Sequence, residues 1–328
     1  MKPQEDSGCA ISVATAYALM FGRQPSPDVL AALHENLGTI EIRDTGGLRR
    51  IIMCLDRQVH VTAATVRFGS AELQKISVEG ITLLVDTADV AVSQSILQEG
   101  TYEAHLTRVF RRYVRPGWRV VDVGANVGYY SMLAASLVGP QGEVLAFDPN
   151  SENARLVLLN AAENQFHNVR LFPLALAERA GYAYFTTHIG SNGSFIADEQ
   201  TQLADGRGVV VPTARLDDLV HATVDFIKLD VEGAEYRVLR GGQRLIAESL
   251  PIISSEFSCD MISRISNTEP RTYLSFFARY GYAIHIISRV SGQIELVADI
   301  DALLRDWGSW WRIEDLLLLP AGTPTLQP

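Results

Sequence analysis

Residues 121–128, which read VDVGANVG, decide the fold of this chain. The run that leads into them, Arg119 to Val123, is typical of a buried strand because valine fills most of its positions. Gly124 follows at once, and an apolar helical pattern extends from about Gly128 to Val138. Glycine permits a tight turn and a close approach of a ligand to the backbone. The stretch therefore predicts a strand, a ligand-binding turn and a helix.

The same alternation of strand and helix continues towards the C-terminus. We expect further strands at residues 143–147, 168–174, 224–230, 251–257, 282–287 and 316–319, with helices at 151–165, 234–248 and 270–280. This spacing predicts an α/β fold with a doubly wound, mostly parallel sheet of seven strands. Ligands bind such sheets beyond the carboxyl ends of the strands. The chemistry is therefore expected just after four strand-end residues, namely Val123, Phe147, Leu174 and Leu229.

The N-terminal third of the chain has a different character. We expect a small, mainly helical region at residues 1–58, a β-rich connecting segment at 59–100 and the main domain at 101–328. A length of 328 residues suits one large domain with a smaller appendage, since domains average roughly 150 residues.

Composition excludes several classes of protein. The formal net charge of −10 disfavours a nucleic-acid partner, because attraction to phosphates needs a basic surface. The three cysteines include no CxxC pair, so neither a disulfide framework nor a zinc site is predicted. No apolar stretch reaches the ~20 residues that span a bilayer. We expect a cytoplasmic protein without a membrane span.

The turn after the first strand indicates a cofactor without phosphates. A dinucleotide fingerprint reads G-x-G-x-x-G, whereas Asn126 holds the position of the second glycine here. The helix that begins near Gly128 offers free N–H groups to a carboxylate. Asp148 ends the second expected strand, 24 positions after Gly124 (148 − 124). A carboxylate there can accept hydrogen bonds from ribose hydroxyls, although an acid at a helix start is the simpler alternative.

Five segments in this order resemble the FkbM family of S-adenosyl-L-methionine (SAM)-dependent methyltransferases. They are Gly100–Glu103, Val121–Gly128, Phe147–Pro149, Arg215–Leu219 and Phe226–Glu235. The resemblance covers roughly residues 80–320 and departs from the family at Asp148, where glutamate is more usual. The segment 181–207 does not follow the family pattern, so the resemblance does not identify the methyl acceptor.

The resemblance implies a class I methyltransferase fold, in which the last strand inserts antiparallel, and a methyl transfer usually to oxygen. It also implies that Glu103 reaches the ammonium group of the cofactor. Six residues are accordingly expected to bind SAM: Glu103, Asp122, Gly124, Asn126, Gly128 and Asp148.

Acidic residues at strand ends are the candidates for catalysis. Transfer from a sulfonium depends mainly on alignment, but a hydroxyl acceptor must also lose its proton. Asp230 ends the fourth strand, and Glu232 and Glu256 are placed to converge with it. The alternative is that Glu232 only orders the loop. Three carboxylates could also hold Mg²⁺. His188, in a segment that could border the acceptor, is a further candidate, with an exposed loop histidine as the alternative.

We therefore predict O-methylation of a hydroxyl on a glycan or a secondary metabolite. An N-methyltransferase of a small molecule is the first alternative, disfavoured because Asp230 to Gly233 replaces an Asn-Pro-Pro-Tyr-type motif. An NAD-dependent oxidoreductase lacks the required glycines. A catalytically inactive SAM-binding scaffold, recruiting partners through residues 10–57, is also consistent with the motifs. The sequence leaves open whether the chain forms a homo-oligomer.

Overall fold

The structure is a computed structural model, and it describes residues 9–11, 66–68, 73–87, 89, 91–187, 191–195, 208–308 and 312–326. His188 and most of the expected N-terminal helices lie outside these residues. Within that region, Cys9–Ile11 forms strand β1, which pairs antiparallel with β2 (Val66–Phe68). A mainly helical region was expected at residues 1–58, whereas residues 9–11 pair as a strand with β2.

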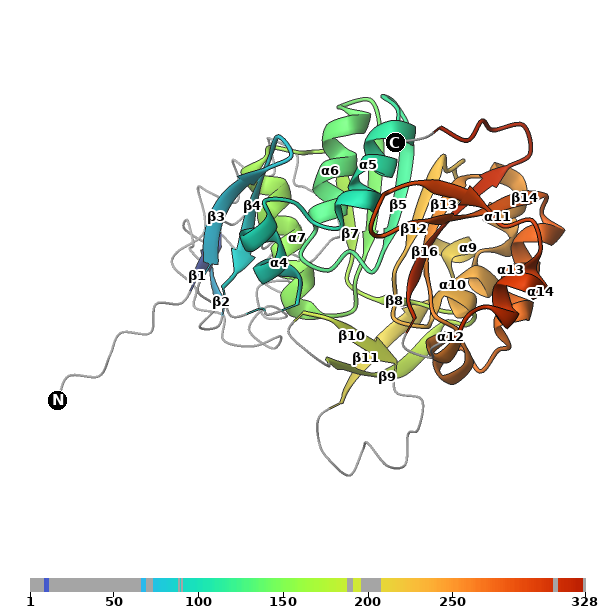
Figure 1. The fold of residues 1–328 in the computed structure, drawn as a ribbon. Helices are drawn as coiled ribbons and strands as arrows, with labels where there is room; N and C mark the ends of the chain where they lie inside the picture. The colour runs from blue at the N-terminus through green and yellow to red at the C-terminus, as the bar shows by residue number, and fades with distance from the viewer. Residues whose placement is uncertain are drawn as a thin grey trace.

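A mixed sheet forms the centre of the described chain (Figure 1). Its eight described strands run in the order β7-β6-β5-β12-β13-β16-β14-β15. They are β5 (Arg119–Val123), β6 (Glu143–Phe147), β7 (Val169–Phe172), β12 (Phe226–Leu229), β13 (Ile252–Phe257), β14 (Tyr282–Ile287), β15 (Ile294–Leu296) and β16 (Glu314–Pro320). The strands from β7 to β13 are parallel, and β16 lies antiparallel between β13 and β14. The predicted doubly wound, mostly parallel sheet is confirmed, and the short β15 extends its edge.

Helices cover both faces of this sheet. One face carries α5 (Ala104–Tyr113), α6 (Tyr129–Val138) and α7 (Ser151–Glu163); the other carries α9 (Leu216–Leu219), α10 (Glu235–Gly241), α11 (Gln243–Ser249), α12 (Cys259–Ile265), α13 (Pro270–Arg279) and α14 (Ile300–Arg305). Because successive strand residues face opposite sides, Val120 packs with the first group and Val121 with the second. Burial of each such side chain contributes about 1.5–3 kcal/mol.

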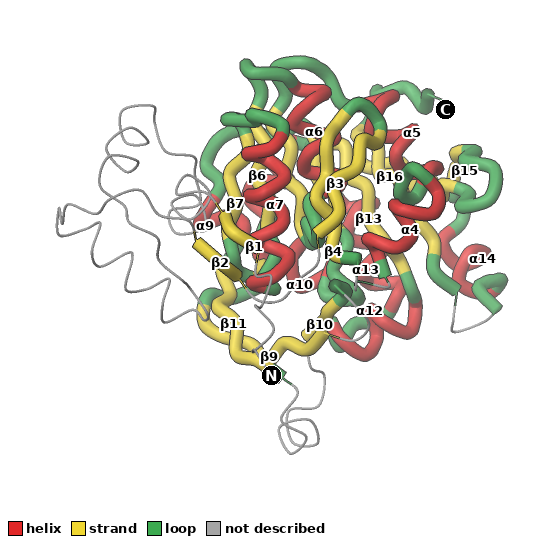
Figure 2. The backbone as a smooth tube through the Cα atoms, turned by 90° about the vertical axis from the view of Figure 1, so that its left-hand side faces the viewer, coloured by secondary structure: helices red, strands yellow, loops and turns green. Residues whose placement is uncertain are grey.

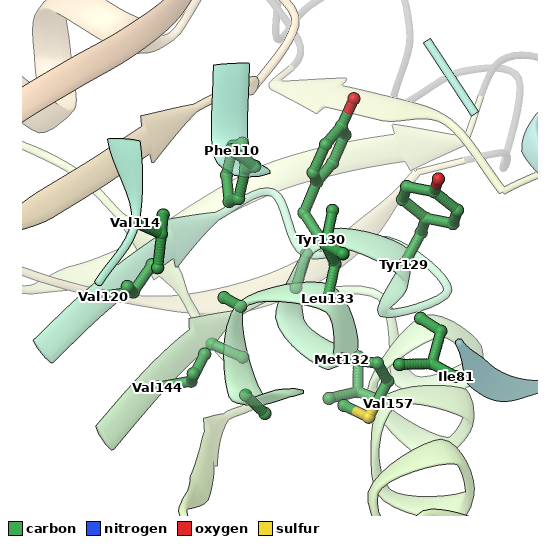
Figure 3. Packing of buried hydrophobic residues seen from close by; sticks show 14 of the residues in the cluster. Ile81, Phe110, Val114, Val120, Tyr129, Tyr130, Met132, Leu133, Val144 and Val157 are labelled. Carbon is green, nitrogen blue, oxygen red and sulfur yellow. The ribbon is translucent and has the colours of Figure 1, made fainter. Parts of the chain in front are cut away.

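A hairpin and a short helix extend the first of these two layers. The hairpin consists of β3 (Leu73–Val78) and β4 (Ile81–Asp86), and α4 (Val92–Glu99) follows it. Ile81 of β4 packs with Met132 of α6 and Val157 of α7, as Figure 3 shows. The hairpin therefore belongs to the same hydrophobic cluster as the sheet.

Asn160 of α7 and Asn164, the C-cap residue of the same helix, bind the backbone of β4. Asn160 Oδ1 accepts from Leu84 N at 2.6 Å, and its Nδ2 donates to Leu84 O at 3.2 Å. Asn164 makes the equivalent pair with Thr82, at 2.8 and 2.6 Å. Side-chain amides thus take the place of a third strand and satisfy a strand edge that water or another chain would otherwise meet.

A second, smaller sheet was not predicted from the sequence. Its order is β10-β9-β11-β8, with β8 (Ala175–Leu176), β9 (Gly181–Thr187), β10 (Gly193–Phe195) and β11 (Val209–Ala214). Figure 2 shows β9, β10 and β11 together at one end of the central strands. Phe185 and Phe195 pack there in a cluster of their own. This sheet forms a wall at the carboxyl ends of β5 and β6.

The helix expected at residues 234–248 is broken into α10 and α11. Gly242 ends the first helix and begins the second. A Cβ on Gly241 would lie 2.2 Å from the carbonyl oxygen of Ala177, and one on Gly242 would lie 2.9 Å from Leu216. The two glycines are therefore required by close packing, which the helical pattern did not reveal.

The described helices are all too short or too polar to cross a lipid bilayer.

Candidate active site

A cavity of about 350 Å³ lies at the carboxyl ends of β5, β6, β12 and β13. The glycine turn after β5 borders it on one side, the small sheet on another, and the first residues before α5 on a third. Seven of the predicted site residues line it: Glu103, Gly124, Asn126, Asp148, Asp230, Glu232 and Glu256. The side chains predicted at the ends of these strands thus lie around one cavity.

The glycine turn has no room for a side chain. Gly124 has φ +79°, and a Cβ there would lie 1.8 Å from the carbonyl oxygen of Asp230. Gly128 has φ +89° and packs against Val157 of α7, so it supports the turn without lining the cavity. Asn126 adopts φ +51°, and its backbone N–H donates to Asp148 Oδ2 at 2.8 Å. The turn is thus tied to the end of β6.

Asp148 lies where a ribose contact was predicted. Its Oδ1 accepts from Asn150 N at 2.8 Å, and Asn153 Nδ2 lies 3.4 Å from both carboxylate oxygens. Burial raises the pKa of Asp148 to about 7, against the lowering effect of these donors. The group is therefore poised between its charged and neutral forms at neutral pH, and it faces the cavity.

Asp122 does not line the cavity, in contrast to the prediction that it binds the cofactor. Its side chain lies beneath the turn, where Oδ2 accepts from Ser131 Oγ at 2.6 Å. Oδ1 has no hydrogen-bond partner among the described residues and lies 3.9 Å from Lys228 Nζ. Burial raises the pKa of Asp122. The side chain is placed to hold Lys228 rather than a ligand.

Glu103 closes the cavity from the opposite side. It occupies the N-cap position of α5 in a left-handed conformation, with φ +42°, and its side chain makes no capping hydrogen bond. Its carboxylate accepts from Tyr130 Oη at 3.1 Å. Burial raises the pKa of Glu103 to about 7. Figure 3 shows Tyr130 and Tyr129 side by side, both hydroxyls pointing away from Met132 of the core.

Asp230, Glu232 and Glu256 converge as predicted. One carboxylate oxygen of each lies within 4.8 Å of the others. Burial, followed by the charge of Asp230, raises the pKa of Glu232 to about 8 and that of Glu256 well above its ordinary value. Glu232 lines the cavity with φ +53°. Loop ordering, the alternative for Glu232, is instead done by Glu235, whose Oε1 accepts from Val231 N at 3.0 Å and Gly233 N at 3.2 Å.

Two cations in this group were missed by the sequence reasoning. Lys228 Nζ lies 3.0 Å from Asp230 Oδ2 and 5.1 Å from the centre of the Tyr130 ring. Arg289 Nη2 lies 3.2 Å from Glu256 Oε1. A lysine inside an apolar strand needs a buried partner. The position of Lys228 within the apolar strand 226–229 could therefore have indicated a buried ion pair. No local pattern placed Arg289 beside a residue 33 positions away.

The loop that contains Ser191 and Asn192 covers the glycine turn. Asn126 Nδ2 donates to Asn192 Oδ1 at 3.1 Å, and Asn153 Nδ2 donates to Ser191 O at 3.0 Å. Asp89, before α4, accepts from Ser191 N at 2.8 Å. His188, three residues earlier, lies outside the described residues. Five carboxyl groups and two cations line the cavity among these residues, which suits a cationic ligand.

A sheet of this order, with its antiparallel inserted strand and a cavity at the carboxyl ends of the parallel strands, defines the class I methyltransferase fold. The family model described as the Methyltransferase FkbM domain matches residues 122–309. The chain belongs to the FkbM methyltransferase family.

Two curated relatives share part of this sequence. The 31-O-demethyl-FK506 methyltransferase FkbM of Streptomyces tacrolimicus is 30% identical over 159 residues, which cover 39% of this chain and 60% of that protein. Methyltransferase sdnD of Sordaria araneosa is 29% identical over 155 residues, covering 37% and 59%. The match thus spans about three fifths of the length of these relatives.

Solved structures are similar at lower identity. The crystal structure of Methyltransferase FkbM from Methylobacillus flagellatus is 16% identical with a TM-score of 0.39, covering 64% of this chain and 50% of that one. Fibrillarin from Aeropyrum pernix, solved with natively bound SAM, is 11% identical with a TM-score of 0.38, covering 75% and 82%.

Proposed function

We propose that this protein transfers a methyl group from SAM to a hydroxyl of a secondary metabolite or a glycan. One observation carries the proposal: a single cavity contains both the glycine turn with Asp148 and the convergent carboxyls of Asp230, Glu232 and Glu256. The first set suits a nucleoside with an amino-acid tail, and the second suits removal of a proton from an acceptor.

The residues present fit SAM. The cradle at Gly124 leaves no space for a Cβ, so a ligand can approach the backbone closely. Asp148 and Glu103 both line the cavity, and we assign Asp148 to the ribose hydroxyls and Glu103 to the ammonium group. The excess of carboxyl groups favours a ligand that carries a sulfonium charge. When bound, SAM would supply an electrophilic methyl group.

The acid cluster is the proposed proton acceptor. Lys228 holds Asp230 at the end of β12, and the raised pKa of Glu232, about 8, makes its carboxylate a stronger base than an ordinary one. The charge of Asp230, after burial, is the largest cause of the raised pKa of both Glu232 and Glu256. Asp230 is assigned the central position, with Glu232 and Glu256 assisting.

Transfer to oxygen is supported by the name of one relative, a 31-O-demethyl-FK506 methyltransferase. By its name, that protein acts on 31-O-demethyl-FK506. Lys228 and Arg289 already neutralise two of the cavity acids, so the proposed reaction uses no Mg²⁺.

The test is methyl transfer from radiolabelled SAM to a panel of hydroxylated metabolites and oligosaccharides. Asp230→Asn keeps the shape of the side chain and removes its charge. It should slow turnover by about 10²-fold or more, the usual scale for loss of a base, while S-adenosylhomocysteine affinity stays within a factor of two or so. Asp260→Asn, on α12 and outside the cavity, is the matched control.

Four outcomes separate the alternatives. Turnover of Asp230→Asn at the wild-type rate refutes the assigned base and makes His188 the next residue to test. Activity that is abolished by EDTA and restored by Mg²⁺ replaces the metal-free reaction by a metal-assisted one. Binding of SAM without transfer to any acceptor, in amine as well as hydroxyl panels, supports the inactive scaffold; transfer to amines alone supports the N-methyltransferase.

A further inference from the structure

Glu256 and Asp315 form a like-charged pair that needs a cation. They lie directly opposite each other on the antiparallel strands β13 and β16, so their side chains share one face of the sheet. Like charges at such a position destabilise a sheet. The Asp315 side chain is buried, with 5% exposed, and the Glu256 side chain is mostly shielded from water, with 14% exposed. A cation between them would relieve this repulsion.

Arg289 supplies that charge from a third strand. It follows β14, in which Ile287 pairs with Asp315. Its Nε lies 3.0 Å from Asp315 Oδ2, and its Nη2 lies 3.2 Å from Glu256 Oε1. The guanidinium is a rigid planar fork. The bond from Nε to Asp315 therefore fixes the orientation of the whole guanidinium, and with it the direction from which Nη2 approaches Glu256.

His105 anchors the far end of this chain of contacts. Its Nε2 lies 2.6 Å from the same Asp315 oxygen, and its side chain is only 8% exposed. His105 is in the first turn of α5, two residues after Glu103, which lines the cavity. The wall that carries Glu103 is thereby joined to the wall that carries Glu256.

We propose that Arg289, anchored by Asp315, is a positioning residue that fixes the Glu256 carboxylate in the cavity and favours its ionised form. The inference rests on the proposed function, in which Glu256 assists proton removal. Without the guanidinium, Glu256 would face acids from the neighbouring elements and lose its cation. The groups that face it are Tyr102, Asp230, Glu232, Glu235, Arg289 and Asp315. Burial and the charges of Asp230 and Glu232 already raise the pKa of Glu256.

The experiment is a carboxyl titration of the full chain, with neither SAM nor an acceptor added. Glutamate is labelled with ¹³C at Cδ, and the Glu256 resonance is assigned by its loss in Glu256→Gln. Arg289→Gln should raise the Glu256 midpoint by about 1–3 pH units, the effect expected from an opposite charge at this distance, or leave the carboxyl protonated up to pH 10. Arg289→Lys keeps the charge but loses the fork, so an intermediate midpoint is expected.

Arg264→Gln is the matched control, because it removes the same charge from a side chain that is 65% exposed and paired with Asp260 on α12. The proposal is overturned if the Glu256 midpoint is the same in Arg289→Gln and in Arg264→Gln. It is also overturned if the midpoint in Arg289→Lys equals that of the wild type, because the charge alone, and not its position, would then matter. Circular dichroism melting checks that each variant is folded, and the lysine variant serves if the glutamine variant is not.

A kinetic readout separates this inference from the proposed function. Once an acceptor is identified, Arg289→Gln should lower kcat with little change in the KM for SAM, since Arg289 holds the base and Asp148 the nucleoside. If the chain transfers no methyl group at all, the proposed function fails while the titration still decides the role of Arg289.

Discussion

Gly124 shows how tightly the turn is built at the scale of one residue. Its backbone has φ +79°, which glycine adopts freely and other residues do not. A Cβ added at this position would contact the backbone of Asp230 and not the end of a flexible side chain. A backbone cannot move aside without shifting the end of β12. The turn and the proposed base therefore constrain each other's position.

Gly124→Ala should cost much more than conformational strain alone. The strain of a left-handed alanine is about 1–2 kcal/mol, and the 1.8 Å approach to Asp230 O adds a displacement of the strand end. We expect at least a tenfold loss of S-adenosylhomocysteine affinity, measured by calorimetry, together with lower stability in urea.

Gly117→Ala is the control for that prediction. Gly117 has φ +82°, but a Cβ there meets nothing within 4 Å. This variant bears the same strain without the contact, so its cofactor affinity should match wild type. Equal affinity losses in the two variants would show that strain, not the close approach to Asp230, matters.

Asn160 illustrates how one side chain can join three elements. It binds both backbone groups of Leu84 in β4, and its Nδ2 also donates to Val127 O in the glycine turn at 2.9 Å. The hairpin, α7 and the turn thus share one amide. The domain boundary at residue 101 remains a prediction; we propose that the folding unit of the catalytic domain includes the hairpin from residue 73.

Asn160→Ala should destabilise the protein and loosen the turn. Each buried backbone group that loses its partner costs about 1–3 kcal/mol, so the free energy of unfolding in urea should fall by at least about 1 kcal/mol, with weaker S-adenosylhomocysteine binding. Glu163→Ala, which removes only the exposed pair with Lys75, should cost less than about 1 kcal/mol. If Asn160→Ala leaves stability and cofactor affinity unchanged, the shared amide has no structural role.

Elements were predictable where one physical signal dominated. The seven strands follow from buried apolar runs, and the gathering of Asp148, Asp230 and Glu256 follows from the rule that parallel strands end on one edge. The small sheet was missed because β8 and β10 are very short, and because β9 and β11 pair across the long intervening segment 188–208. Arg289 was missed because its contact depends on β16 lying between β13 and β14, which no local pattern encodes.

At the scale of the whole molecule, buried carboxyl groups should make stability depend on pH. Burial raises the pKa of Asp148 and Glu235 to about 7 and that of Glu232 to about 8. Such a group binds its proton more tightly in the folded protein than in the unfolded chain, where its pKa is near 4. The contribution of these groups to stability is therefore fully present below about pH 4. It is lost as the pH rises through about 7–8.

The free energy of unfolding without cofactor should accordingly fall between pH 5 and pH 8, as measured by urea titration at fixed ionic strength. Glu235→Gln removes one of these groups without touching the cavity lining, so its decline should be shallower. Carboxyls with lowered pKa, such as Glu143 and Glu178, act only at more acidic pH. Stability that rises from pH 5 to pH 8 would contradict the prediction.

The position of β16 has a consequence for synthesis. Among the described strands, β13 and β14 are joined only through β16, which also carries Asp315. When residues up to 300 have emerged from the ribosome, β13 and β14 have been synthesised but β16, which lies between them, has not. The nascent chain then presents two open strand edges, which attract strands of other chains. A chain that stops before residue 314 should therefore need chaperones or aggregate, rather than persist as a partly active enzyme.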